Sequence, residues 1–118
     1  MENNKIYSMS FNKVYSLLIA KAERKGKNKE DVYELTAWLL GYRKDKIESM
    51  YNSDISYGDF FLNAINFNPK AENIKGSICG VKIEEIEDPL MKKIRYLDKL
   101  VDELAKGKTV EKILDKYK

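Results

Sequence analysis

The strongest apolar pattern in the chain runs from Pro89 to Lys106. Apolar residues recur there at alternating spacings of four and three, which is typical of a helix with one buried stripe. They are Leu90, Ile94, Leu97, Val101 and Leu104. Asp88 is a suitable N-cap before Pro89, and Gly107 suits the left-handed residue that follows a last helical turn. The pattern predicts a long helix on which the other segments pack.

Four shorter segments upstream show the same helical spacing of apolar residues. Three of them follow a good capping residue: Ser10, Asn28 and Ser56, the last two with an aspartate three residues later. The remaining one lacks a strong cap. We expect helices over residues 11–25, 29–41, 44–51 and 57–65. The last of these carries the aromatic wall of the core, which comprises Tyr57, Phe60, Phe61, Ala64 and Ile65.

The segments next to the long helix are shorter or less regular. Asn68 before Pro69 predicts one helical turn up to about residue 73, and Thr109 can cap a last amphipathic helix that reaches Tyr117. Residues 76–87 mix the periods of strand and helix. An isolated strand would leave its backbone groups unpaired, so loop or helix is favoured there, with a short extended segment near residues 78–83 as the alternative.

These elements together predict an all-α fold. The arrangement that we expect is a small orthogonal bundle of five or six helices around the long C-terminal helix. A chain of 118 residues is long enough for one hydrophobic core and short for two. We therefore expect a single helical domain over residues 1–118, with residues 1–9 as a flexible N-terminus.

The charge of the chain is mildly positive and unevenly distributed. The formal net charge is +3, and residues 1–50 carry ten basic and seven acidic side chains while residues 51–118 carry twelve of each. A bias of this size permits an anionic partner without requiring one.

A single cysteine cannot form a disulfide within the chain, and no apolar run has the length of a secretory or membrane segment. We expect a cytoplasmic protein that does not bind membranes.

Two stretches of the sequence resemble a known family. YSMSFNKVYSLLIAKAERKG and NPKAENIKGSICGVKIEEIEDPLMKKIRYLDKLVDELAKGKTVEKIL are similar to segments of the small bacterial proteins called domain of unknown function 2200. The resemblance spans about Ile6 to Leu114 and implies a compact, mostly helical domain without an assigned activity. It implies no catalytic or binding residue. Arg43 stands where family members tend to have a small hydroxyl residue, at the start of the expected third helix.

A basic cluster lies at the junction of the first two expected helices. Its members are Lys21, Arg24, Lys25, Lys27 and Lys29. One interpretation is contact with an anion or with a nucleic-acid backbone, as in a helix-turn-helix protein. The second helix opens with Glu30 and Asp31, which would repel phosphate. The favoured interpretation is a solvated helix end, where positive side chains complement the last carbonyl groups.

Other residues with chemical potential have a structural explanation that we favour. Glu84, Glu87 and Asp88 could offer oxygen ligands to a hard cation such as magnesium, but they also suit the first turn of the long helix. The chain has no histidine, which is the commonest base for a cysteine nucleophile such as Cys79 and the commonest partner of cysteine in a zinc site. The Walker spacing of a phosphate-binding loop is also absent. Four aromatic residues could line a ligand pocket, although core packing is the usual role of such residues. They are Trp38, Phe60, Phe61 and Phe67.

We therefore expect a non-enzymatic binding or structural module, with no cofactor and no identifiable small-molecule ligand. A homodimer through the long helix is one expectation, because Met91 and Leu100 lie partly off the apolar stripe and could widen it into an interface. The alternative function is nucleic-acid binding through residues 21–29. The least favoured is an enzyme that uses Cys79 or the carboxylates of residues 84–88.

Overall fold

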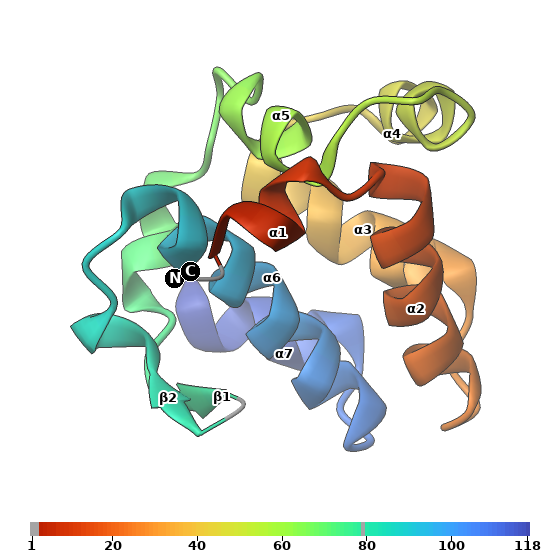
Figure 1. Ribbon diagram of the computed structural model, residues 1–118. Coiled ribbons are helices and arrows are strands. Elements are labelled where there is room, and N and C mark those ends of the chain that lie inside the picture. Colours follow the sequence, from red (N-terminus) through yellow and green to blue (C-terminus); the bar gives the residue numbers. More distant parts are fainter. Residues whose placement is uncertain (1–2, 79) are drawn as a thin grey trace.

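The computed structural model describes residues 3–78 and 80–118. These residues form seven α-helices, two short 3-10 turns and one two-stranded hairpin (Figure 1). The helices are α1 (Asn3–Ser8), α2 (Phe11–Glu23), α3 (Lys29–Leu40), α4 (Lys44–Tyr51), α5 (Tyr57–Leu62), α6 (Pro89–Ala105) and α7 (Val110–Tyr117). The 3-10 turns are η1 (Pro69–Asn73) and η2 (Ile83–Glu85), and the strands are β1 (Ser77–Ile78) and β2 (Val81–Lys82). The all-α prediction is confirmed.

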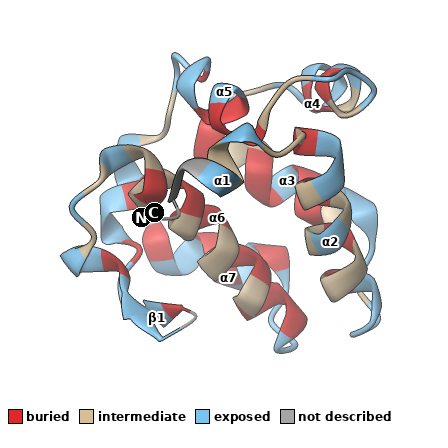
Figure 2. Ribbon diagram, in the orientation of Figure 1, coloured by how far each residue is buried: buried red, intermediate tan, exposed pale blue. Residues whose placement is uncertain are grey.

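The long helix α6 lies at the centre of the molecule. It contacts α2, α3, α5 and α7, and its inward residues are buried while its open side remains partly exposed (Figure 2). Ile94, Leu97, Val101 and Leu104 are fully buried, and Leu90 packs against the core while partly exposed. The predicted stripe is therefore confirmed as the structural centre of the core.

Met91 and Leu100 are also buried inside the monomer, with 7% and 0% of their surface exposed. The expectation that they widen an exposed apolar face on α6 is wrong, because neighbouring helices of the same chain already cover them. A homodimer stays a prediction, and it would require a different surface.

The helix starts follow the predicted capping chemistry. Each of five capping side chains accepts a hydrogen bond from a backbone amide in the first helical turn, at 3.0–3.2 Å. They are Ser10, Asn28, Ser56, Asp88 and Thr109. The start of α4 is different, since Arg43 occupies the N-cap position and gives no side-chain cap. The helix nevertheless begins at Lys44, because Ile47 and Met50 are buried in the core.

Aromatic rings from α2 and α5 fill one half of the core. The ring of Phe11 stacks on that of Phe60 with centroids 3.9 Å apart, and Phe60 meets Phe61 edge to face at 5.5 Å. The aromatic wall predicted for α5 is confirmed for Tyr57, Phe60, Phe61 and Ala64, which are buried, and wrong for Ile65, which is 91% exposed. The helix already ends at Leu62, so Ile65 lies in the following loop.

That loop is held against the end of α3. The backbone amide of Asn68 donates to the carbonyl of Leu39 at 2.9 Å, and its side chain donates to the carbonyl of Trp38 at 3.1 Å. Gly41 ends α3 with φ of 80°, and a Cβ atom there would lie 2.3 Å from the carbonyl oxygen of Asn66. This close approach of the two segments requires glycine at position 41.

The strands β1 and β2 form a small antiparallel hairpin, in which Ser77 pairs with Lys82 and Ile78 with Val81. The preference for loop or helix over residues 76–87 is wrong for these two strands, where the alternative of a short extended segment is correct, and it holds for the 3-10 turn η2. The strands form because each finds its partner within the same segment. Lys99 on α6 donates to the carbonyl of Ser77 at 3.2 Å and ties the hairpin to the central helix.

The sequence does not predict α1, which occupies part of the segment that we expected to be flexible. The hydroxyl of Tyr7 donates to Asp88 at 2.5 Å. The other carboxylate oxygen of Asp88 accepts the amide of Leu90 at 3.0 Å. Asp88 therefore caps α6 and anchors α1 with one side chain.

This double role predicts a pH dependence. The hydrogen bond from Tyr7 lowers the pKa of Asp88 below its ordinary value of 3.8. A carboxyl with a depressed pKa stabilises the fold above its unfolded pKa, and the stabilisation is lost as the pH falls through the lowered value. Asp88→Asn should therefore be less stable than the wild type at about pH 7, and the difference should be smaller at about pH 2.5. Urea unfolding of both proteins at the two pH values measures this, and a stability difference that does not change with pH would contradict it.

Candidate functional site

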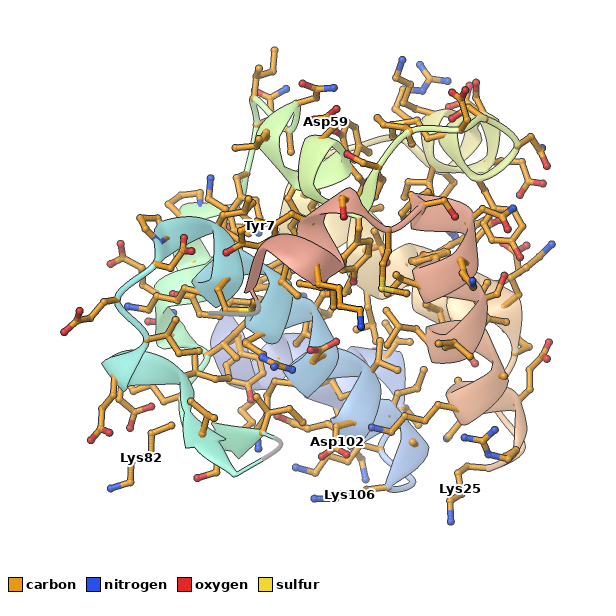
Figure 3. All side chains as sticks on the ribbon, in the orientation of Figure 1. Tyr7, Lys25, Asp59, Lys82, Asp102 and Lys106 are labelled. Atoms are coloured by element: carbon orange, nitrogen blue, oxygen red, sulfur yellow. The ribbon has the colours of Figure 1, made fainter. Side chains whose placement is uncertain are left out.

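A basic hollow lies between the carboxyl ends of α2 and α6. Its volume is about 640 Å³. It is lined by Lys21, Arg24, Lys25, Asp102, Ala105, Lys106 and Gly107. Figure 3 shows Lys25 and Lys106 extending away from the ribbon at the same edge of the molecule, with Asp102 close to Lys106. The hollow brings together four cationic side chains and one carboxylate.

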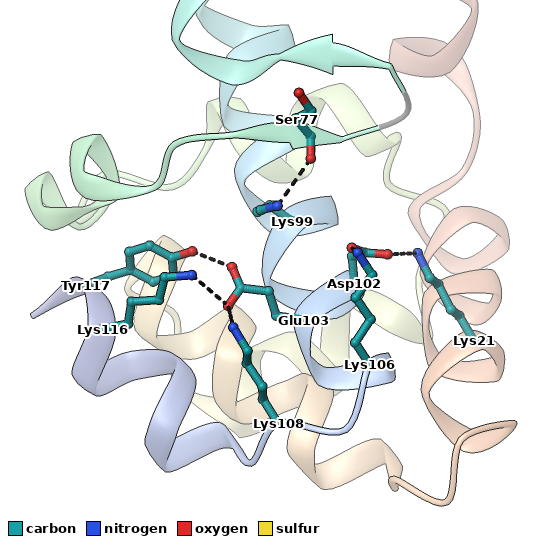
Figure 4. Close-up of polar contacts among 9 residues, drawn as sticks. All are labelled: Lys21, Ser77, Lys99, Asp102, Glu103, Lys106, Lys108, Lys116 and Tyr117. Carbon is teal, nitrogen blue, oxygen red and sulfur yellow. Dashed lines mark hydrogen bonds and ion pairs between the residues drawn. The ribbon is translucent and has the colours of Figure 1, made fainter.

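Asp102 organises the cations from the two helices. Its carboxylate lies 3.2 Å from the ammonium of Lys21 and 3.1 Å from that of Lys106 (Figure 4). Partial burial disfavours the ionised form, but the hydrogen bonds from Lys106 and Lys21 outweigh it and lower the pKa of Asp102. The carboxylate is therefore ionised at neutral pH, and it joins α2 to α6 across the floor of the hollow.

Arg24 and Lys25 have no such partner. Neither side chain lies within ion-pair distance of a carboxylate in residues 3–78 and 80–118. Both are exposed directly after the last turn of α2. Their positive charge complements the final carbonyl groups of α2 and remains available to an anionic group from solvent.

The structure brings together only part of the basic cluster predicted from the sequence. Lys21, Arg24 and Lys25 line the hollow, whereas Lys27 and Lys29 do not. The ammonium of Lys29 instead lies 5.7 Å above the ring of Tyr33. Contact between the five residues and nucleic acid stays a prediction.

The fold and this geometry can now be compared with known proteins. A family model described as an uncharacterized protein conserved in bacteria, DUF2200, matches residues 5–115. The chain belongs to the DUF2200 family. The resemblance noted in the sequence is confirmed.

A solved structure agrees with this assignment. The crystal structure of uncharacterized protein SP1917 has 52% sequence identity to this DUF2200 protein and a TM-score of 0.95. The match covers 98% of this chain and 94% of that one. No match was found among the curated proteins. The comparisons thus establish family and fold, and neither supplies an activity.

The acidic residues at 84–88 of this DUF2200 protein have structural partners. Glu84 accepts the backbone amide of Gly76 at 3.1 Å, which lowers its pKa, and Asp88 has the partners described above. Glu84 and Glu87 do not lie in the first turn of the long helix, because η2 ends at Glu85, the chain at Ile86 is extended and α6 begins at Pro89. Within the described part of the chain, no three potential metal ligands come together.

The remaining candidates of the sequence have different outcomes. Cys79 lies outside the described residues. Phe60 and Phe61 are fully buried, so they belong to the core. Trp38 packs against the core while partly exposed, and Phe67 lines a hollow of its own.

None of the helices in residues 3–78 and 80–118 has the length and apolar character to cross a membrane.

Proposed function

We propose that this DUF2200 protein is a non-enzymatic module that binds another protein. The contact surface is the α2–α6 face, which we define as Val14, Leu17, Lys21, Arg24, Lys25 and Lys106. The observation that carries the proposal is the position of Leu17, which is 64% exposed one helical turn before Lys21. The partner is expected to present an apolar side chain next to carboxylates.

The spacing of residues on α2 supports one continuous surface. Leu17 precedes Lys21 by four residues and Arg24 by seven, so the three side chains lie on one helical face. Val14 is partly exposed one turn earlier and extends the apolar part. An apolar centre beside arginine is characteristic of protein interfaces, whereas a phosphate-binding surface gains little from an exposed leucine.

The charges on this face favour an acidic partner over a second copy of the chain. A symmetric homodimer across the face would place Arg24 and Lys25 of one copy near the same residues of the other, and like charges repel. A carboxylate from a partner could instead pair with these two side chains without breaking an existing ion pair. The geometry therefore supports a heteromeric contact.

The neighbouring charges also weaken the case for nucleic acid. Asp102 lies inside the hollow, and Glu23, Glu30 and Asp31 are close in sequence to the basic cluster. A phosphate backbone would encounter these carboxylates together with the lysines. Duplex DNA nevertheless serves as the comparison ligand in the test below.

Site-specific crosslinking tests the proposal in the bacterial cell. A photoreactive phenylalanine derivative at position 17 should form a covalent adduct with a protein partner, and the same derivative at position 62 should not. Leu62 is a matched control because it is 62% exposed on a different helix. The absence of any protein adduct specific to position 17 would contradict the proposal.

Affinity measurements with the purified crosslinked partner then test the chemistry. Leu17→Ala and Lys25→Glu should each weaken binding about tenfold, equivalent to about 1.4 kcal/mol. Leu62→Ala and Lys46→Glu should leave it unchanged, since Lys46 is exposed on α4. If the protein instead binds duplex DNA with steep salt dependence, and Leu17→Ala has no effect on that binding, the nucleic-acid alternative is correct.

A further inference from the structure

Two adjoining hollows lie beside the amino-terminal half of α6, between this helix and the segment around η1. One has a volume of about 220 Å³ and largely apolar walls, which include Phe67, Pro69, Ala71 and Pro89. The other has a volume of about 340 Å³ and is more polar. Neither includes a residue of the α2–α6 face, so any ligand here is independent of the proposed function.

Three residues line both hollows: Glu72, Lys92 and Tyr96. They therefore mark the junction between the apolar and the polar part. The distance between the carboxylate of Glu72 and the ammonium of Lys92 exceeds ion-pair range, since no such pair is formed among the described residues. Two opposite charges thus face the same space without neutralising each other.

Tyr96 adds a third polar group at this junction. Its side chain is 6% exposed, and its hydroxyl makes no hydrogen bond within the described part of the chain. Burial raises the pKa of Tyr96, and the nearby carboxylate of Glu72 raises it further. The hydroxyl is therefore protonated at neutral pH and can donate to a ligand or accept from one.

We propose that the two hollows form a binding site for a free amino acid with an aromatic side chain. The carboxylate of the ligand pairs with Lys92, its ammonium pairs with Glu72 beside the Tyr96 hydroxyl, and its ring enters the apolar hollow. An apolar cavity of about 150 Å³ holds benzene, so 220 Å³ has room for a phenyl or indole ring. The ring would lie near Phe67, whose centroid is 6.4 Å from that of Tyr96.

The two charges select for a zwitterion. A ligand with only a carboxylate would bring a second negative charge toward Glu72, and a ligand with only an ammonium would leave Lys92 unpaired. Lys93 lies 4.9 Å from the ring centroid of Phe67, which places a further cation at the rim of the apolar hollow. The polar hollow is also lined by Lys75 and Glu84, which add one charge of each sign. A ligand that carries both a carboxylate and an ammonium therefore suits these walls better than an anion alone.

Calorimetric titration of the purified full chain with L-phenylalanine tests the proposal. L-phenylalanine should bind, while 3-phenylpropanoate and 2-phenylethylamine, which each lack one charge, should bind at least tenfold more weakly. L-alanine, which lacks the ring, should also bind at least tenfold more weakly than L-phenylalanine. Equal affinity for L-phenylalanine and for either singly charged analogue would overturn the proposal, as would the absence of binding to any aromatic amino acid.

Two charge-neutralising variants test whether the amino acid binds between Glu72 and Lys92. Lys92→Met and Glu72→Gln should each lower the affinity for L-phenylalanine at least tenfold. Lys112→Met and Glu111→Gln, on the exposed side of α7, should not change it. Amide NMR spectra of each variant show that the fold is retained. If N-acetyl-L-phenylalaninamide binds as tightly as the free amino acid, the site recognises a side chain within a peptide and the proposal is wrong.

Discussion

Replacing Leu97 by alanine is expected to lower the free energy of unfolding by about 3 to 5 kcal/mol. Leu97 lies in the middle of α6 and is fully buried among residues from several helices. Truncation removes apolar contacts and leaves a cavity, because densely packed neighbours relax only partly. Urea unfolding followed by the fluorescence of Trp38 and by circular dichroism measures the change, since the chain has a single tryptophan.

The same substitution on the surface provides the control. Leu62→Ala changes an identical side chain that is 62% exposed, and it should alter the free energy of unfolding by less than about 0.5 kcal/mol. Similar effects of the two substitutions would mean that α6 does not form the centre of the core.

Replacing Glu103 by alanine is expected to destabilise the protein by about 2 to 3 kcal/mol. Glu103 is 4% exposed and accepts a hydrogen bond from the hydroxyl of Tyr117 on α7 (Figure 4). Its carboxylate also lies 3.3 Å from the ammonium of Lys108 and 3.5 Å from that of Lys116. Both lysines are about half exposed, so water can replace Glu103 as the partner of their ammonium groups. The main loss of stability therefore comes from the buried Tyr117 hydroxyl, which is left without an acceptor.

Two further variants separate the hydrogen bond from the charge. Glu103→Gln keeps an acceptor for Tyr117 and should lose less stability than Glu103→Ala. Glu111→Ala removes an exposed carboxylate from α7 and should change the free energy of unfolding by less than about 0.5 kcal/mol. Hydrogen exchange of the α7 amides should accelerate in Glu103→Ala before that of α6. Unchanged stability and unchanged exchange would show that Glu103 does not hold the last helix.

The parts of the fold that could be predicted from sequence are those governed by local rules. The stripe on α6 follows from periodicity, and the start of α3 follows from the Asn28 and Asp31 capping pair, whose reciprocal hydrogen bonds are present. The packing of α1 depends on a contact that local rules do not describe, and the hairpin, although its strands pair locally, is also held by a distant residue. Tyr7 reaches a residue 81 positions later, and the hairpin is fastened to α6 through Lys99.

The candidate site also consists of residues that could be predicted from the sequence and residues that could not. Lys21, Arg24 and Lys25 could be found from the sequence because they are neighbours on one helix. Asp102 and Lys106 could not, because they lie about 80 residues further along and meet α2 only through the packing of α6. The exposure of Leu17 was also hidden, since its apolar character alone would place it in the core.

The affinity of the crosslinked partner for Leu17→Ala, compared with that for Leu62→Ala, tests the proposed contact face most directly. The two variants lose the same atoms from similarly exposed leucines on different surfaces. We expect Leu17→Ala to weaken binding about tenfold while Leu62→Ala binds like the wild type. Equal affinity of both variants would contradict the assignment of the α2–α6 face as the binding surface.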